Sequence, residues 1–246
     1  MIKKLLEIKE LRGKIKLISG LHIGAGNDEI HIGGIDNPVV KNPLNDYPYI
    51  PGSSLKGKIR TLLEWYLGKV NSEGKPYFVE SGKGDEITLI FGNGSNEKEY
   101  AGGPTRASFN DCSLTQESLE KMRKKSALTE EKIEVSINRL SGTASQSGPR
   151  NIERVPAGAE FDFSLSYLVF DDIDKQYFNY LILGLKLLEL TALGGSGSRG
   201  YGKIRFEFDD NSDIKDFTKL VSDDAETKLY VLNDLKDIKA VINNNK

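Results

Sequence analysis

Residues 187–206, LLELTALGGSGSRGYGKIRF, decide how the fold is interpreted. The segment ends an apolar helical pattern, passes through five glycines and continues into the alternating pattern of a strand. Gly195, Gly197 and Gly200 match the dinucleotide-binding motif G-x-G-x-x-G. That motif must follow a strand and open a helix, because its phosphates bind at the helix N-terminus. Here a helix precedes the glycines and a strand follows, so the segment does not predict a dinucleotide site.

The same segment contains most of a P-loop pattern. Four residues separate Gly197 from Gly202, and Lys203 follows, as that motif requires. The next residue is Ile204, whereas a P-loop has a Ser or Thr there that holds magnesium. A nucleoside triphosphate site is therefore not predicted either.

Two explanations of these glycines remain open. Gly194 and Gly195 suit a helix C-cap, because glycine adopts positive φ without strain. One or two glycines would be enough for a cap, yet residues 194–202 contain five glycines, two serines and Arg199. Successive backbone amides beside an arginine form a nest that binds phosphate. The segment therefore indicates either a plain turn or an anion-binding loop.

The elements before this loop predict an α+β fold. Apolar residues alternate with charged ones at 13–18, as in a half-exposed strand, and residues 52–68 have a helical apolar face. Strand patterns recur between 105 and 169, a helix is predicted at 174–193 and a strand at 203–208. With insertions removed the order is β-α-β-β-α-β, which is the ferredoxin-like pattern.

Three of these elements have clearly defined faces. Ser53 or Ser54 is expected to cap the first helix. Its buried face is expected to contain Leu55, Ile59, Leu62, Leu63 and Tyr66. Strand 160–169 is expected to bury Phe161, Phe163, Leu165, Tyr167 and Val169. The apolar stripe of the second helix consists of Phe178, Leu181, Ile182, Leu185 and Leu188.

One large domain with insertions accounts for the 246 residues. Residues 69–100 and 139–158 are expected to be insertions. Residues 141–159 are small, polar and glycine-rich and lie between two strand patterns, which is typical of a protruding hairpin or a mobile loop. Residues 209–246 are expected to form an acidic segment and a closing helix.

The composition predicts a soluble protein. The single cysteine, Cys112, fits a reducing cytoplasm. No apolar run reaches the roughly 20 residues of a membrane helix, and no signal-peptide pattern is found. The formal net charge is −2, but two short segments carry only basic charges. They contain Lys56, Lys58 and Arg60 between 52 and 63, and Arg199, Lys203 and Arg205 between 193 and 205.

Several long phrases resemble one known family. The glycine segment and YIPGSSLKGKIRTLLE (49–64) are similar to the glycine-rich loop and first helix of the RAMP proteins of CRISPR effector complexes. GLHIGAG (20–26), IGGIDNPVVKNP (32–43) and the phrases INRLSGTA and PRNIERVPAGAEFDF within 137–163 narrow the resemblance. Together these phrases resemble the backbone subunit of type III-A (Csm) complexes, which is the third of the Csm proteins. The resemblance covers most of residues 13–208.

The resemblance implies a ferredoxin-like, RRM-like palm with an inserted thumb hairpin. Such subunits stack with copies of themselves as a helical filament along a guide crRNA, beside other Csm-complex subunits. The palm holds the guide through phosphates, and the thumb, best matched by 139–156, splays out target RNA nucleotides. The RNA-binding residues that the resemblance implies are His22, Ser54, Lys56, Lys58, Arg60, Arg139, Arg150, Arg154, Gly197, Ser198 and Arg199.

The resemblance also implies cleavage of the target RNA, with Asp36 of GGIDNP as the catalytic residue. Two roles are open for this carboxylate. It holds a divalent cation, Mg²⁺ or Mn²⁺, or it orients the RNA 2′-hydroxyl that attacks the adjacent phosphate. By itself the sequence also permits an Asx turn before Pro38. Two histidines and a distant cysteine do not predict a zinc site.

Two other functions remain open. One is a scaffold subunit that binds RNA without cutting it, although the presence of Asp36 favours cleavage. The other is a stand-alone endoribonuclease that processes guide precursors, with His22 as its general base.

Overall fold

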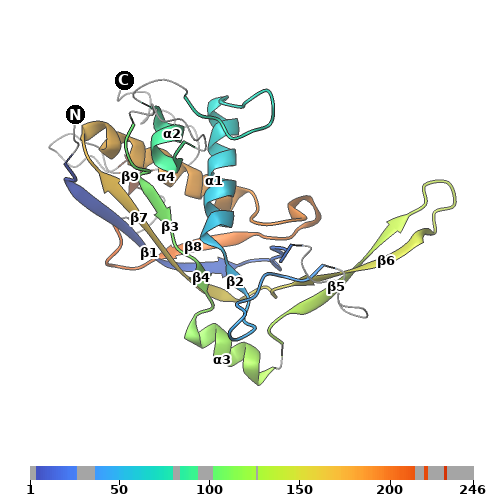
Figure 1. Ribbon diagram of the computed structural model, residues 1–246. Helices are drawn as coiled ribbons and strands as arrows, with labels where there is room; N and C mark the ends of the chain where they lie inside the picture. Colours follow the sequence, from blue (N-terminus) through green and yellow to red (C-terminus); the bar gives the residue numbers. More distant parts are fainter. Residues whose placement is uncertain are drawn as a thin grey trace.

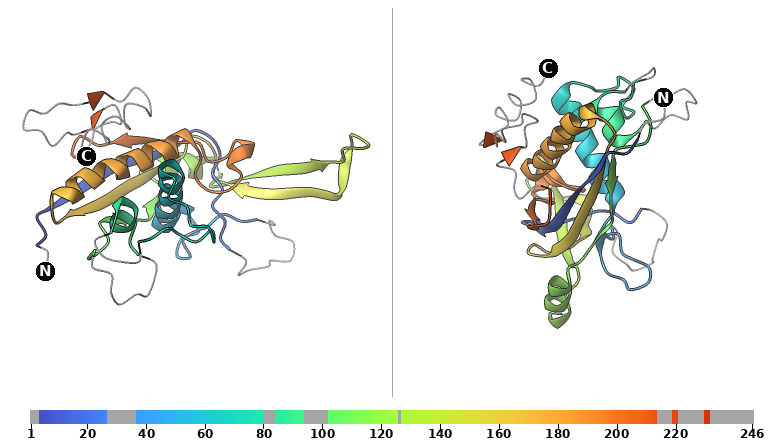
Figure 2. Two further views of the ribbon diagram at one scale, coloured as in Figure 1. Left: turned by 90° about the horizontal axis from the view of Figure 1, so that it is seen from above. Right: turned by 90° about the vertical axis from the view of Figure 1, so that its left-hand side faces the viewer.

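The structure is a computed structural model that describes residues 4–26, 37–79, 84–93, 102–125, 127–213, 219–220 and 230–231. A four-stranded antiparallel sheet with helices packed on one face forms the body of the molecule, which we call the palm (Figure 1). A long hairpin, which we call the thumb, projects from the palm (Figures 1 and 2). The palm elements are β1 (Glu7–Leu17), α1 (Gly52–Leu67), α2 (Glu86–Phe91), β3 (Ala107–Phe109), β7 (Glu160–Val169), α4 (Asp172–Leu190) and β8 (Ile204–Phe208).

The palm confirms the ferredoxin-like prediction. Its strands lie in the order β3-β7-β1-β8, and each neighbouring pair is antiparallel. The first and third palm strands therefore lie in the middle, with the second and fourth at the edges. Along the chain the order is β1-α1-β3-β7-α4-β8 once α2 and the thumb are set aside, which is β-α-β-β-α-β.

The core lies between this sheet and its helices. All five residues predicted to face inward from β7 are at most 3% exposed, because alternate side chains of a strand share a face. The predicted stripe of α4 is buried as well. Gly184 lets α4 approach α1 closely, since a Cβ there would lie 2.6 Å from Cγ2 of Ile59. The two helices and the sheet thus enclose one hydrophobic core.

The start of α1 differs from the sequence prediction. Neither Ser53 nor Ser54 caps the helix, because Pro51 occupies the N-cap position and no side-chain cap bond is formed. Instead the amide of Gly52 donates a 2.7 Å hydrogen bond to Oδ1 of Asp111. Gly52 is required there, because a Cβ would overlap the carbonyl oxygen of Phe109. A contact distant in sequence therefore replaces the predicted local cap.

Between β1 and the thumb, the described chain also forms two short helices and one small strand pair. The apolar segment at 86–91 forms α2, capped by Asp85, whose side chain accepts from the amide of Thr88. Helix α3 (Gln116–Lys124) is capped by Thr115, whose side chain accepts from the amide of Ser118. Strands β2 (Tyr49–Ile50) and β4 (Cys112–Ser113) pair antiparallel.

The thumb consists of β5 (Glu130–Ile137) and β6 (Ala144–Arg154), which form a separate two-stranded sheet. Of the two options left open for 141–159, the structure shows a hairpin. Among the strand patterns expected between 105 and 169, the one at β5 belongs to this hairpin and not to the palm sheet. Small, polar residues gave β6 no strand signal of its own. Pairing with β5 supplies what propensity lacks, because strand preference depends strongly on neighbouring strands.

Beyond β8, the structure describes two short strands, β9 (Lys219–Leu220) and β10 (Tyr230–Val231), which pair antiparallel. The closing helix predicted within 209–246 falls mostly on residues outside the described part. In the part of the chain that is described, no helix is long and apolar enough to cross a membrane.

Candidate nucleic-acid interface

The glycine loop between α4 and β8 is not a helix cap. Helix α4 ends at Leu190, and its C-cap is Thr191 with φ of −108°, so Gly194 and Gly195 come too late in the chain to cap it. Gly194 has φ of +73°, and a Cβ there would overlap the carbonyl oxygen of His22. The loop is therefore built for close packing of its backbone against another segment.

The centre of this loop, at Gly197 and Ser198, is exposed to solvent. Ser196 adopts φ of +58°, a conformation that residues other than glycine rarely adopt and that often marks functional sites. A 3₁₀ turn over Gly197–Arg199 follows it. Within the described structure, the amides of Gly197 and Ser198 donate no hydrogen bond. This geometry is compatible with the anion-binding explanation, which stays a prediction.

His22 lies against the glycine loop and the thumb. Its carbonyl oxygen accepts a 2.9 Å hydrogen bond from the amide of Gly195. Its Nδ1 lies 2.7 Å from the carbonyl oxygen of Glu153, close to the end of β6. The structure thus brings together two of the segments predicted to contact RNA, although they are more than 170 positions apart in the sequence.

A groove of about 420 Å³ joins the glycine loop to the thumb. Its charged lining consists of Lys132, Arg139, Arg150 and Arg199, with Glu134 as the single acid. Arg199 pairs with Glu134 at 2.9 Å but keeps 55% of its side chain exposed. Exposed cations along a groove are typical of surfaces that follow a phosphate backbone.

The three predicted thumb arginines have different surroundings. Arg139 and Arg150 are exposed; Arg139 donates to the carbonyl of Ile137, and Arg150 donates to the hydroxyl of Ser136. Arg154, in contrast, lies at the root of the thumb, where its Nε is 2.6 Å from Oε1 of Glu130. Arg139 and Arg150 are available to solvent, whereas Arg154 is part of the junction with the palm.

The basic residues of α1 also divide into two groups. Arg60 donates to Oε1 of Glu64 at 2.8 Å and to the carbonyls of Gly92 and Tyr77, with only 12% of its side chain exposed. Its guanidinium is thus engaged inside the palm. Lys56 forms no ion pair with the described residues, and burial together with the neighbouring Arg60 lowers its pKa. Of the predicted set, Ser54, Lys56 and Lys58 are partly exposed, and Lys58 lies over the Trp65 ring.

Asp36 lies outside the described residues, but both ends of its segment are described. The two described ends contact each other, because Val40 donates to the carbonyl of Ile23 and Gly24 bridges Val39. Asn37 bridges Ile152 of β6. The described residues that follow Asp36 therefore lie at the root of the thumb.

Glu153 joins these residues to the thumb, and no sequence motif pointed to it. Its carboxylate, only 2% exposed, accepts from the amide of Val39, from Lys41 Nζ at 2.6 Å and from the hydroxyl of Thr129. Burial by itself raises the pKa of Glu153, but these bonds outweigh it and lower the pKa. The partners of its carboxylate come from two segments distant in sequence, 39–41 and 129, which explains why only the tertiary structure reveals it.

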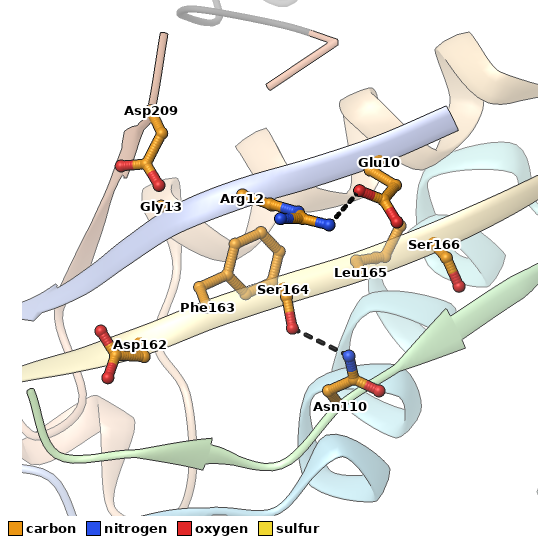
Figure 3. A pocket seen from close by; sticks show the side chains of 10 residues that line it. All are labelled: Glu10, Arg12, Gly13, Asn110, Asp162, Phe163, Ser164, Leu165, Ser166 and Asp209. Carbon is orange, nitrogen blue, oxygen red and sulfur yellow. Dashed lines mark hydrogen bonds and ion pairs between the residues drawn. The ribbon is translucent and has the colours of Figure 1, made fainter. Parts of the chain in front are cut away.

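The open face of the palm sheet has a different chemistry. A groove of about 410 Å³ lies on this face. Figure 3 shows the side chains that line it, with helices behind the sheet. Its charged side chains are Glu10, Arg12, Asp162 and Asp209, so acids outnumber bases. RRM domains stack bases on aromatic side chains of this face. Here the aromatic residues of β7 are at most 3% exposed, including Phe163 at the groove, so β7 offers no exposed ring for stacking.

The described residues do not form a metal centre. Among them, no group of three or more His, Cys, Asp or Glu side chains is placed to hold a metal ion. Glu153, which contacts the segment that follows Asp36, already bonds to Lys41, Thr129 and Val39. A divalent cation therefore does not fit a site made of these residues alone.

The ferredoxin-like palm, its glycine loop and the basic groove define a palm-and-thumb protein of the kind that handles nucleic acid. A family model described as "RAMP superfamily" matches residues 14–205. The chain belongs to the RAMP superfamily, as the resemblance of its sequence phrases predicted.

Relatives and solved structures narrow the comparison. Proteins named "CRISPR system Cms endoribonuclease Csm3" from Methanocaldococcus jannaschii and Streptococcus thermophilus are 43% and 44% identical to this chain. The alignments cover 80% and 79% of this chain and 77% and 84% of those proteins.

Among solved structures, a chain of the Csm3–Csm4 subcomplex in the type III-A CRISPR-Cas interference complex has a TM-score of 0.53 and 31% identity. That match covers 83% of this chain and 77% of the other. Csm3 of Methanopyrus kandleri has a TM-score of 0.56 at 24% identity, over 83% of this chain and 76% of that one, and supports the fold alone.

Proposed function

We propose that this chain is an endoribonuclease subunit of a cytoplasmic type III-A CRISPR interference complex. In this role it binds a guide crRNA, stacks with further copies of itself and with other Csm subunits, and cuts the paired target RNA. Relatives at 43–44% identity that carry the name endoribonuclease support this proposal. So does the similarity to a chain from a Csm3–Csm4 subcomplex.

The observation that carries the RNA-binding part is the groove between the glycine loop and the thumb. Its cations outnumber its acids four to one, which favours a phosphate backbone as its occupant. Contacts to phosphates position a nucleic acid without reading its bases. A guide held in this way keeps its bases free to pair with a target.

The chemistry of cleavage needs little from the protein, because the nucleophile belongs to the RNA. The 2′-hydroxyl attacks the adjacent phosphorus, a new O–P bond forms, and the bond to the 5′-oxygen of the next nucleotide breaks. The protein must hold the nucleotide so that these atoms are in line, and it must accept the hydroxyl proton. We assign proton acceptance or orientation of the hydroxyl to Asp36.

A divalent cation is a separate part of the proposal. When bound, it would supply positive charge to the phosphate that is attacked. The described residues do not provide its ligands, so we propose that Asp36 and RNA phosphates would hold it together. Chelation with EDTA is expected to abolish cleavage while guide binding persists. Unchanged cleavage in EDTA would remove the cation from the proposal.

Asp36→Asn in the assembled complex tests the catalytic assignment. The amide keeps the shape of the side chain but removes its charge and basicity, so RNA binding should stay near wild type. Cleavage of complementary RNA should fall by roughly 10²–10⁴-fold. Asp46→Asn is the matched control, because Asp46 is exposed in a turn with φ of +58°, which Asn also tolerates.

The outcomes separate the three functions. Regularly spaced cuts that disappear in Asp36→Asn but not in Asp46→Asn support the proposal. If the wild-type complex leaves the target RNA intact, the result supports the scaffold function, in which the subunit binds RNA without cutting it. Cutting of guide precursor by the isolated subunit would instead support guide processing, with His22 as the next residue to replace.

A further inference from the structure

Tyr201 of the glycine loop lies against the thumb. Tyr201 has no exposed surface. Nζ of Lys132, on β5, lies 4.4 Å from the centre of its ring, and the guanidinium carbon of Arg154, on β6, lies 5.1 Å from it. Cations within about 6 Å of an aromatic ring are attracted by its negative face, more strongly when water is excluded. The ring therefore binds both strands of the thumb.

The palm side of this contact is fixed by backbone. The amide of Gly202 donates to the carbonyl of Gly20, and the amide of Leu193 donates to the carbonyl of Gly202. A Cβ on Gly202 would overlap the carbonyl oxygen of Leu193, so the chain beside Tyr201 is tightly packed. Arg154 in turn packs on Gly20, where a Cβ would lie 2.5 Å from its side chain. The ring thus has a rigid base on the palm.

The other contacts that hold the thumb lie at its root, where Glu153 bonds to Val39 and Lys41 and its carbonyl oxygen contacts His22. Among the described strands, β5 and β6 pair only with each other apart from single bridges near the end of β6. Arg154 lies opposite Glu130 and Lys132 opposite Ile152, so the two cations belong to the innermost rungs of the hairpin. Outward from them, Glu134 of β5 contacts the glycine loop twice, through an ion pair with Arg199, whose side chain stays 55% exposed, and at Tyr201. Ion pairs that are open to solvent contribute little.

We propose that Tyr201 is a positioning residue that fixes the angle between the thumb and the glycine loop. Its consequence for regularly spaced cleavage rests on the function proposed above, but the clamp itself does not. If the loop holds the guide and the thumb displaces target nucleotides, this ring fixes the distance between the bound guide and the displaced nucleotides. Loss of the clamp would leave each part folded and make their relative position variable.

The clamp is measurable in the RNA-free protein with two spin labels. The native Cys112 is buried, and burial raises the pKa of its thiol to about 12, so it does not react with labels. Leu140→Cys places one label at the fully exposed tip of the thumb, and Glu207→Cys places the other on exposed palm strand β8. Pulsed dipolar spectroscopy then gives the distribution of distances between them.

Two pairs of variants isolate the ring and its cation. Tyr201→Phe keeps the aromatic face, whereas Tyr201→Leu removes it. Lys132→Arg keeps a cation over the ring, whereas Lys132→Met keeps most of the length without charge. The second pair keeps the test valid if Tyr201→Leu fails to fold.

A single narrow distance peak is expected in the wild type, in Tyr201→Phe and in Lys132→Arg. Loss of that peak to a broad distribution is expected in Tyr201→Leu and Lys132→Met, with an unchanged melting temperature in Lys132→Met. A narrow peak retained in both Lys132→Met and folded Tyr201→Leu would overturn the clamp, whatever the RNA experiments show.

Cleavage by the assembled complex then connects the clamp to function. With Tyr201→Leu we expect cuts to lose their regular spacing while total cleavage persists, and Tyr201→Phe should restore the spacing. If the wild-type complex binds no RNA, the function proposed above fails while the spin-label result stands. If spacing survives in a variant whose distance peak is lost, the link between thumb angle and cutting is wrong.

Discussion

The palm and the thumb are both antiparallel β-structure, yet different forces hold them. In the palm, strand β7 buries every second side chain beneath two helices. In the thumb, the corresponding alternate residues of β5 face solvent, with Ile133 63% and Val135 45% exposed, and Leu140 at the tip is fully exposed. Burial stabilises the palm, whereas strand pairing and contacts at the root hold the thumb. Stability and geometry are therefore expected to respond to different substitutions.

The thumb also shows that an alternating pattern need not indicate a core. On one side of β5 lie Lys132, Glu134 and Ser136, with Arg150 of β6 beside them, and this side lines the groove. The apolar residues alternate with these on the other side. The sequence pattern of such a strand is the same as that of a palm strand, and only the partner across each face differs.

The largest effect should come from breaking the buried ion pair of the palm. Arg106 and Asp174 are both fully buried, and Nε of Arg106 lies 2.8 Å from Oδ1 of Asp174. Asp174→Ala leaves the arginine charge without its partner, which should cost about 3–5 kcal/mol in the free energy of unfolding. Chemical denaturation measures this, with Asp172→Ala, on the exposed side of the same helix turn, as the control. Similar values for the two variants would contradict the assignment.

A smaller loss in the free energy of unfolding is expected for Arg60→Ala. Arg60 and Lys56 lie on the same helix α1, but only Arg60 is hydrogen-bonded within the palm. This change removes three hydrogen bonds and leaves Glu64, 8% exposed, without its cation. We expect a loss of about 1.5–3 kcal/mol, typical of bonds to charged groups.

Lys56→Ala is the matched variant of the same helix. It should leave stability nearly unchanged but lower the log–log salt slope of single-stranded RNA binding by roughly 0.7. If Arg60→Ala changes the salt slope without affecting stability, its guanidinium contacts RNA instead.

Acid should destabilise the root of the thumb locally, and the loss of stability should be smaller than that expected for Arg60→Ala. The pKa of Glu153 is lowered in the folded protein from its ordinary value of 4.5. The stability it contributes is therefore present above about pH 4.5 and is lost as the pH falls through the folded-state pKa. Native-state hydrogen exchange should show residues 37–41 opening earlier than the palm strands below that pH. In Glu153→Gln this difference should already exist at pH 7, and its absence would argue against this role of Glu153.

The smallest effect on stability should come from removing the outer thumb. Deleting residues 135–149 and joining Glu134 to Arg150 through Asn-Gly keeps the inner rungs and a two-residue turn. Because the outer rungs bury little, the free energy of unfolding should change by less than about 0.5 kcal/mol. Calorimetry measures this, and a large loss would mean that the outer thumb supports the palm.

Much of the palm was predictable because its signals are local. The apolar faces of α4 and β7 and the helix–glycine–strand order follow from periodicities of 3.6 and 2 residues. The N-terminus of α1 was not predictable in this way, because Asp111, 59 positions away, replaces the serine cap. Strand β6 was missed as a strand for a similar reason, since its partner β5 supplies the pairing that its own residues do not favour.

In the candidate site, too, some features were predictable from the sequence and others were not. The sequence by itself determined the ferredoxin-like order, the family and the segments that contain Asp36, the glycine loop and the thumb arginines. Only the tertiary structure decided which charges are free, since it engages Arg60 within the palm and leaves Arg150 at the groove. It alone brought Tyr201 against Lys132 and Arg154, and Glu153 against Lys41. The physical reason is that periodicity encodes which face of an element is buried, whereas the partner of a buried charge or ring is chosen by packing between segments far apart in the chain.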